Sequence, residues 1–222
     1  MGMSGTGKPS SARNAESGVR PHPVAACRVW GVVLAAGESR RMGTPKQLLA
    51  FGGVTMVEAV AATLLEADLA GVLVVLGHEA ERVAAAVRHL PVRCVVNAEY
   101  RSGMLTSVQC AVRSLPDAEA VCIALVDQPS IPARVVSALV EALCKGQKGI
   151  VVPTYQGRRG HPIAVDLRRY RLEIMSLPSE IGLRALLQAH PDDVLEVAVD
   201  TEAVVKDIDS PEDYDGGGRD PK

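Results

Sequence analysis

The 222-residue chain carries a segment of small and basic residues directly after its first apolar run. It reads LAAGESRRMGTPKQLL over residues 34–49. The small side chains at 35–37 let a ligand approach the backbone closely, and consecutive N–H groups can form an anion-binding nest. Arg41 adds a fork of N–H donors and Lys46 adds a movable positive charge, both of which suit phosphate. The spacing is neither that of a P-loop nor that of G-x-G-x-x-G, so kinase-type and simple dinucleotide sites are disfavoured.

A single carboxylate stands at the end of another apolar run. Asp127 follows residues 121–126 and precedes Gln128-Pro129, where the proline ends a strand. Mg²⁺ keeps several waters and takes one or two protein carboxylates together with phosphate oxygens, so one well-placed Asp is enough to begin a site. The alternative role for an isolated Asp at such a position is the N-cap of a helix.

Apolar, β-rich runs alternate with segments of helical period between the two ends of the chain. The predicted strands are 28–35, 72–76, 92–96, 121–126, 150–154, 161–165 and 194–199, and the predicted helices are 55–68, 80–89, 105–115, 133–145, 167–177 and 181–189. Near-continuous Val, Ile and Leu is typical of strands covered on both faces. The alternation predicts an α/β fold, a three-layer α/β/α arrangement around a doubly wound, mostly parallel sheet. Ligands of such sheets bind beyond the carboxyl ends of the strands.

Two capping patterns mark helix starts in this order of elements. Thr55 and Glu58 form a capping box, and Ser210 is the expected N-cap of a last short helix. Cys94 and Cys122 lie inside apolar runs and are expected to pack in the core as small apolar side chains.

Composition and charge exclude several classes of protein. The formal net charge is −2 and aromatic residues make up 3% of the chain, which argues against a nucleic-acid binder. No apolar stretch approaches the roughly 20 residues of a membrane span, and no signal peptide is visible, so a cytoplasmic protein without membrane contact is expected. Residues 1–26 and 215–222 are expected to be disordered on either side of a single domain at 27–214, which we expect to be monomeric.

The segment 34–49 resembles the signature L-A-A-G-x-S-x-R-M-G-x-P-K-x-L-L of the MobA-like nucleotidyltransferases. The resemblance runs from about Val29 to Tyr214. It implies a Rossmann-like nucleotidyltransferase fold, similar to that of nucleotide-diphospho-sugar transferases, in which this loop wraps the triphosphate of a nucleotide. It implies nucleotide binding by Leu34, Ala35, Ala36, Gly37, Arg41 and Lys46. It also implies catalytic roles for Arg41, Lys46 and Asp127, with the two basic side chains neutralising the α-phosphate and the leaving pyrophosphate.

Two acidic motifs resemble the metal-binding motifs of the family. D-Q-P at 127–129 implies Asp127 as a Mg²⁺ ligand, although the family usually has Gly where this chain has Val126. The string DIDSPED at 207–213 resembles the family's D-I-D-T-P-E-D and implies Asp207 or Asp209 as the second ligand. Asp207 is preferred because Asp209 adjoins the start of a helix, where a capping role is natural.

Three further motifs resemble family motifs for the two substrates. G-M-L-T-S at 103–107 resembles G-M-S-S-S and implies nucleotide binding by Gly103 and Ser107. G-H-P at 160–162, preceded by arginine, and G-L-R at 182–184 resemble motifs on the acceptor side. They imply that the acceptor is bound by Arg159, Gly160, His161 and Arg184.

Within the family, the motifs are most similar to those of the cytidylyltransferases of the molybdenum cofactor (MocA type). The guanylyltransferase relatives usually carry L-A-G-G, so Ala36 favours a pyrimidine nucleotide. The resemblance implies Mg²⁺-dependent transfer of CMP from CTP to the terminal phosphate of the molybdopterin-type cofactor, with release of pyrophosphate. It also implies a molybdenum hydroxylase apoenzyme, or its chaperone, as a protein partner.

Three alternatives stay open at this point. The first is a sibling nucleotidyltransferase with another phosphorylated acceptor. The second is an NAD(P)H-dependent oxidoreductase of the same sequence group. The third is a catalytically inactive, nucleotide-binding partner of a molybdoenzyme.

Overall fold

The structure, a computed structural model, describes residues 1, 27–39 and 42–214. Residues 2–26 and 215–222, for which disorder is predicted, lie outside the described residues. Arg41, predicted to contact phosphate, also lies outside them.

An eight-stranded sheet forms the middle of the molecule. Its strands are β1 (Val29–Ala35), β4 (Gly71–Leu76), β5 (Arg93–Val96), β6 (Ala120–Leu125), β7 (Ile150–Tyr155), β8 (Arg158–Arg159), β9 (Ile163–Asp166) and β10 (Val194–Ala198). Their order is β10-β7-β9-β6-β1-β4-β5, with β8 paired to β7. β1 is parallel to both β4 and β6, and β9 is antiparallel to both β6 and β7. The prediction of a mostly parallel sheet is confirmed.

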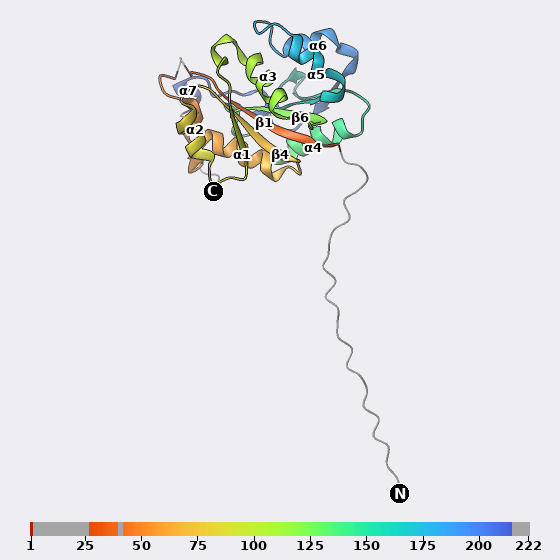
Figure 1. Cartoon of the computed structure of the whole chain (residues 1–222), viewed down its shortest axis with the longest axis horizontal. Helices are drawn as coiled ribbons and strands as arrows, with labels where there is room; N and C mark the ends of the chain where they lie inside the picture. The colour runs from red at the N-terminus through yellow and green to blue at the C-terminus, as the bar shows by residue number, and fades with distance from the viewer. Residues whose placement is uncertain (2–26, 40–41, 215–222) are drawn as a thin grey trace.

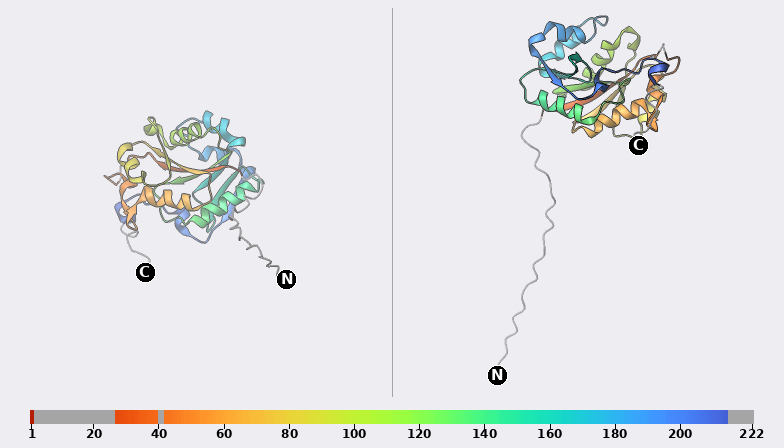
Figure 2. Two further views of the ribbon diagram at one scale, coloured as in Figure 1. Left: turned by 60° about the horizontal axis from the view of Figure 1, so that its bottom comes forward. Right: turned by 180° about the vertical axis from the view of Figure 1, so that it is seen from behind.

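Helices cover both faces of this sheet (Figures 1 and 2). One face carries α1 (Met56–Glu66), α2 (Ala80–Val87) and α4 (Ala133–Cys144), and the other carries α3 (Met104–Ser114), α5 (Leu167–Ser176) and α6 (Arg184–Ala189). Val33 of β1 belongs to the first core and Val32 to the second, because successive side chains of a strand point to opposite faces. The predicted three-layer α/β/α architecture is therefore confirmed.

Short elements complete the chain. They are the hairpin strands β2 (Ala50–Phe51) and β3 (Val54–Thr55), the 3₁₀ turns η1 (Lys46–Leu48), η2 (Tyr100–Ser102), η3 (Pro191–Asp193) and η4 (Glu202–Val205), and the helix α7 (Pro211–Tyr214). Gly52 and Gly53, which join β2 to β3, have φ angles of +56° and +86°. Glycine adopts this left-handed conformation without a side-chain penalty, which permits the tight hairpin.

The predicted capping box at the start of α1 is present. Thr55 N–H donates to Glu58 Oε2 at 2.8 Å, and Glu58 N–H donates to Thr55 Oγ1 at 3.4 Å. The helix predicted from residue 181 begins instead at Arg184, because Gly182 has a left-handed φ of +74° that an α-helix cannot contain.

The expectation that Cys94 packs in the core is wrong, whereas Cys122 is fully buried as expected. Cys94 lies on β5, which is the last strand in the order of the sheet and pairs with β4. Three of the four β5 residues are exposed, as is common on the last strand of a sheet. None of the helices in the described parts of the chain is long and apolar enough to cross a membrane.

Candidate active site

The pairing of β1 with β6 brings two predicted site segments together. Leu34 of β1 is in register with Leu125 of β6, so the loop after β1 emerges beside Asp127. The chain continues from β1 to β4 on one side and returns to β6 on the other, which makes the β1–β6 boundary a topological switch point. Ligands of doubly wound sheets bind in the crevice at such a point.

Lys46 reaches across this crevice from η1. Its Nζ lies 2.5 Å from Asp127 Oδ2 and 3.1 Å from Asp209 Oδ1. Burial by itself would lower the pKa of Lys46, but the two carboxylates outweigh it and raise the pKa above 10.5. Lys46 is therefore fully charged near neutral pH.

A backbone hydrogen bond fixes the segment 207–209 against Asp127. Ile208 N–H donates to the Asp127 carbonyl oxygen at 2.8 Å, and the Ile208 side chain is buried. Asp207 Oδ1 accepts a hydrogen bond from Gln128 Nε2 at 2.7 Å. The hydrogen bond from Ile208 places the segment that carries Asp207 and Asp209 beside Asp127, just after the end of β6.

Ser210 and Asp213 form the cap of α7. Ser210 is the N-cap, as predicted: Asp213 N–H donates to Ser210 Oγ at 3.3 Å, and Ser210 N–H donates to Asp213 Oδ2 at 2.9 Å. The carboxylate of Asp209 accepts a hydrogen bond from Lys46.

The donor set around Asp127 fits a divalent cation that is also held by phosphate. Asp127 Oδ1 is buried and has no hydrogen-bond partner among the described residues, which is an unfavourable state for a carboxylate oxygen that binds nothing. Within the described ranges, no group of three or more His, Cys, Asp or Glu side chains is arranged to hold a metal alone. A Mg²⁺ ion at this position would need phosphate oxygens and waters to complete its ligands, which is its usual coordination in phosphate-transfer sites.

A first cavity, of about 210 Å³, opens beside Lys46 and Asp127. It is lined by Leu34, Ala36, Gly37, Lys46, Gln47, Tyr100, Met104, Ser107, Leu125, Val126 and Asp127. Most residues predicted to bind nucleotide line it, whereas Ala35 and Gly103 do not. The hydroxyl of Ser107 accepts a hydrogen bond from Asn97 Nδ2 at 3.0 Å, which orients it at the start of α3.

A second, larger cavity of about 700 Å³ lies on the other side of Met104. All four residues predicted to bind an acceptor line it, namely Arg159, Gly160, His161 and Arg184, and most of the rest of its lining is apolar. Met104 lines both cavities and is half-exposed, so the two cavities are neighbours.

The G-H-P segment sits tightly at the inner end of the second cavity. A Cβ atom at Gly160 would lie 1.9 Å from the Val204 carbonyl oxygen, so only glycine fits there. Burial lowers the pKa of His161 below 6.5, against the attraction of Asp207 and Asp127, so its imidazole is neutral near pH 7. Arg159 is engaged by Glu196 at 2.7 Å, whereas Arg184 has no ion pair with any described residue.

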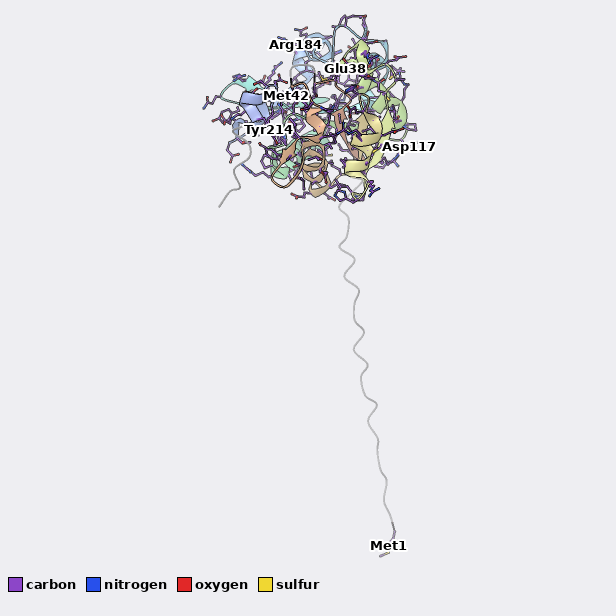
Figure 3. The ribbon with its side chains drawn as sticks, turned by 90° about the vertical axis from the view of Figure 1, so that its left-hand side faces the viewer. Met1, Glu38, Met42, Asp117, Arg184 and Tyr214 are labelled. Atoms are coloured by element: carbon purple, nitrogen blue, oxygen red, sulfur yellow. The ribbon has the colours of Figure 1, made fainter. Side chains whose placement is uncertain are left out.

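The loop after β1 lies at one end of the molecule. Figure 3 views the molecule from that end and labels Glu38 and Met42 of the loop together with Arg184 and Tyr214. Tyr214 of α7 donates from its hydroxyl to the Ala50 carbonyl oxygen at 2.6 Å, which ties α7 to the β2 strand.

The sequence does not predict three residues in or beside the first cavity. Gln47 and Tyr100 line it, and Gln128 hydrogen-bonds Asp207 next to it. None of the three has a motif-like spacing of its own. The one sequence feature that could have indicated these residues is a polar side chain between apolar ones, because such a side chain is usually buried and hydrogen-bonded.

A doubly wound sheet with a cation-and-carboxylate pair at its switch point is typical of enzymes that bind nucleotides. The family model for the MobA-like NTP transferase domain matches residues 31–194. The chain belongs to the MobA-like NTP transferase family, a family of nucleotidyltransferases.

Named relatives differ in what their names say they do. The chain is 32% identical over 192 residues to nicotine blue oxidoreductase of Paenarthrobacter nicotinovorans, covering 83% of this chain and 93% of the relative. It is 30% identical over 190 residues to a protein of Opitutus terrae named Probable molybdenum cofactor guanylyltransferase, covering 73% of this chain and 91% of the relative.

Solved structures share the fold over most of the chain. The crystal structure of Rv0371c from Mycobacterium tuberculosis H37Rv superposes with a TM-score of 0.76 at 29% identity, covering 87% of this chain and 98% of that one. A complex of the same protein with manganese gives a TM-score of 0.72 at 28% identity, covering 85% of this chain and 97% of that one.

Proposed function

We propose that this protein transfers CMP from CTP to the terminal phosphate of the molybdopterin-type molybdenum cofactor and releases pyrophosphate. The observation that carries the proposal is the pair of neighbouring cavities with Lys46 and Asp127 in the wall of the smaller one. A nucleotide in the smaller cavity and a phosphorylated acceptor in the larger one would meet beside this pair.

The nucleotide side of the site favours a pyrimidine. Ala36 lines a cavity of only about 210 Å³, in which a methyl group would take space that a purine needs. The family's guanylyltransferases usually have glycine at the matching position. The loop 35–37 and Lys46 would surround the triphosphate, and Arg41 would contribute a further charge.

The acceptor side suits a large, partly apolar molecule with an anionic group. Its lining combines Ile163, Leu183 and Leu187 with the guanidinium of Arg184. A pterin ring would pack on the apolar wall, while Arg184 would bind a negatively charged group as a bidentate donor.

The reaction needs charge neutralisation and alignment more than proton transfer. The acceptor is a phosphate monoester that is already ionised near neutral pH, so no general base is required. Lys46 would neutralise charge that develops between the α-phosphate and the leaving pyrophosphate, and the two cavities would align the reacting groups. A bound Mg²⁺ would supply further neutralisation of the phosphate oxygens.

Asp127 and Asp209 are the residues that we propose to hold Mg²⁺. The Lys46 ammonium touches both carboxylates, so these two side chains already share one cation. Asp207, the other candidate, accepts a hydrogen bond from Gln128 and would stabilise the segment that carries Asp209 without binding the metal itself. Titration with Mn²⁺ in the presence of CTP, followed by electron paramagnetic resonance, tests this choice. Asp209→Asn should weaken Mn²⁺ binding more than Asp207→Asn, and the opposite ranking would assign the role to Asp207.

The test of the function is an assay of pyrophosphate release with CTP, Mg²⁺ and molybdenum cofactor. Asp127→Asn should lower the transfer rate by at least about 100-fold while the melting temperature shows a folded protein. Full activity of that variant would contradict the metal assignment.

An NAD(P)H-dependent oxidoreductase is the second candidate, and the similarity to nicotine blue oxidoreductase favours it. Hydride transfer from a nicotinamide needs no divalent cation, so it gives no role to the Lys46–Asp127–Asp209 group. Oxidation of NADPH by a quinoid substrate, without any turnover of CTP, would establish this function in place of the first.

A further inference from the structure

Gln47 is a completely buried polar residue, and none of the proposed catalytic roles accounts for it. Its relative exposure is 0%. Its Nε2 donates to the Ala35 carbonyl oxygen at 3.1 Å and to the Gly37 carbonyl oxygen at 2.6 Å. Burial of an amide is unfavourable unless its hydrogen bonds are made, so this side chain holds one particular backbone conformation of the loop.

The other end of the same amide connects the loop to η1. Ser39 Oγ donates to Gln47 Oε1 at 3.4 Å and accepts a hydrogen bond from Lys46 N–H at 2.9 Å. The loop after β1 and the turn that carries Lys46 are therefore joined by one closed hydrogen-bond network.

The Ala36 carbonyl group, between those of Ala35 and Gly37, also accepts a hydrogen bond from the protein. The Ala36 carbonyl oxygen accepts a hydrogen bond from His78 N–H at 3.1 Å, and a Cβ atom at Gly77 would lie 2.6 Å from it. The three consecutive carbonyl oxygens of 35–37 thus have protein donors. A phosphate in the cavity would then meet a backbone whose carbonyl oxygens already accept hydrogen bonds, which reduces their repulsion of an anion.

We propose that Gln47 is a positioning residue for the triphosphate of the nucleotide. It acts through the backbone of 35–37 and through Lys46, which it holds at a fixed place relative to Asp127. The inference rests on the proposed function in one respect only, namely that the cavity beside Lys46 binds a nucleoside triphosphate.

The substitution Gln47→Glu keeps the shape of the side chain and removes the N–H donors. The new carboxylate would face the Ala35 and Gly37 carbonyl oxygens, so the loop has to turn away. Loss of a group that orients ligand-binding groups typically lowers affinity by about 10- to 100-fold. We expect a drop of this size in the affinity for Mg·CTP and for inorganic tripolyphosphate.

Gln109 provides a matched control. Its Nε2 also donates to two carbonyl oxygens, those of Ile174 and Leu177, each at 3.0 Å, and it does not line either cavity. Gln109→Glu should therefore lower the melting temperature without changing the affinity for Mg·CTP. A merely structural role for Gln47 would give the same result for both variants.

Isothermal titration calorimetry of the full chain with Mg·CTP and with tripolyphosphate, alongside thermal melts, decides the matter. Affinity lost in Gln47→Glu and kept in Gln109→Glu supports the proposal, and unchanged affinity in folded Gln47→Glu overturns it. If Gln47→Glu does not fold, Ser39→Ala takes its place, because it breaks the same network without a buried charge. We expect about a 3- to 10-fold loss there, and unchanged affinity would overturn the proposal. A wild-type protein that binds tripolyphosphate but not CTP contradicts the proposed function alone, and one that binds neither contradicts both.

Discussion

Lys46 Nζ lies 2.5 Å from Asp127 Oδ2, although the two residues are 81 positions apart in the chain. The same nitrogen lies 3.1 Å from Asp209 Oδ1, so one ammonium group sits between two carboxylates. The positive charge of Lys46 suits phosphate, and the negative charges of Asp127 and Asp209 suit a metal ion. All three charges lie within one hydrogen-bonded group. Binding of a metal-nucleotide complex would separate them, because the triphosphate attracts Lys46 while the cation attracts the two carboxylates.

Replacement of Lys46 by methionine tests two proposed roles of its charge, namely the neutralisation of phosphate and the competition with the metal ion for Asp127 and Asp209. Lys46→Met should lower the rate of nucleotidyl transfer by about 100- to 1,000-fold, since the charge beside the α-phosphate is lost. The same variant should bind Mn²⁺ more tightly than the wild type in the absence of nucleotide, because no ammonium competes for Asp127 and Asp209. Electron paramagnetic resonance measures the free Mn²⁺.

Lys145→Met is the control for this variant. Lys145 forms an exposed ion pair with Glu141 at 2.9 Å, and exposed pairs contribute little. Weaker Mn²⁺ binding in Lys46→Met than in the wild type would show that Lys46 supports the metal ligands instead of competing with the metal.

Replacement of Ala36 by glycine tests the choice of base. Ala36→Gly enlarges the cavity beside Lys46 and should raise the efficiency with GTP relative to CTP by about 10-fold, the scale of one methyl group in a closed pocket. Competition assays with equal concentrations of the two nucleotides measure the ratio. An unchanged ratio would mean that the base does not contact this wall.

Replacement of Arg184 tests the acceptor cavity separately from the nucleotide cavity. Arg184→Gln should raise KM for the acceptor by about 10-fold or more and leave KM for CTP unchanged, because a charged hydrogen bond to an anion is lost on one side only. Arg158→Gln is the matched control, since Arg158 is a nearby exposed arginine that does not line this cavity. Equal effects of the two substitutions would indicate a general effect of positive charge on the approach of the acceptor.

Asp166 makes the stability of the fold depend on pH in the acid range. It caps α5 by accepting a hydrogen bond from Arg168 N–H at 2.9 Å. Burial would raise the pKa of Asp166, but the hydrogen bonds and charge of Arg168 outweigh it and hold the pKa below 3.8. The folded-state pKa is thus lower than the unfolded one. This contribution to stability is complete above about pH 4 and is lost as the pH falls through the folded-state pKa.

Asp166→Asn should therefore lower the melting temperature at pH 7 by about 2–4 °C, the scale of one helix cap in a domain of this size. The difference from the wild type should shrink below pH 3.8. Thermal melts from pH 2.5 to pH 7 measure it, with Asp200→Asn as a control because the Asp200–Arg134 pair is exposed. A difference that stays constant across this range would show that the charge of Asp166 is not the cause.

Most of the sheet was predictable because its interior strands are buried on both faces. β1, β4 and β6 are almost continuously apolar, and only strands in that environment tolerate such sequences. The edge strand β5 was harder, because three of its four residues, CVV, are apolar as in a buried strand. β5 is exposed because it is the last strand in the order of the sheet, and the residues of β5 themselves do not indicate that position.

Part of the candidate site was predictable from the rule that ligands bind at the carboxyl ends of parallel strands. That rule selects the loop after β1 and Asp127. It does not choose between Asp207 and Asp209, because their positions depend on the hydrogen bond from Ile208 to Asp127. It also does not find Gln47, whose partners become visible only when the loop folds back over η1.

The most direct test of the central claim is a single incubation of the full chain with Mg·CTP and molybdenum cofactor, analysed by chromatography for pyrophosphate and the cofactor-bound cytosine dinucleotide. We predict that both products form in equal amounts and that Asp127→Asn forms them at least about 100-fold more slowly. No product from CTP with wild-type protein, together with oxidation of NADPH by a quinoid substrate, would contradict the account.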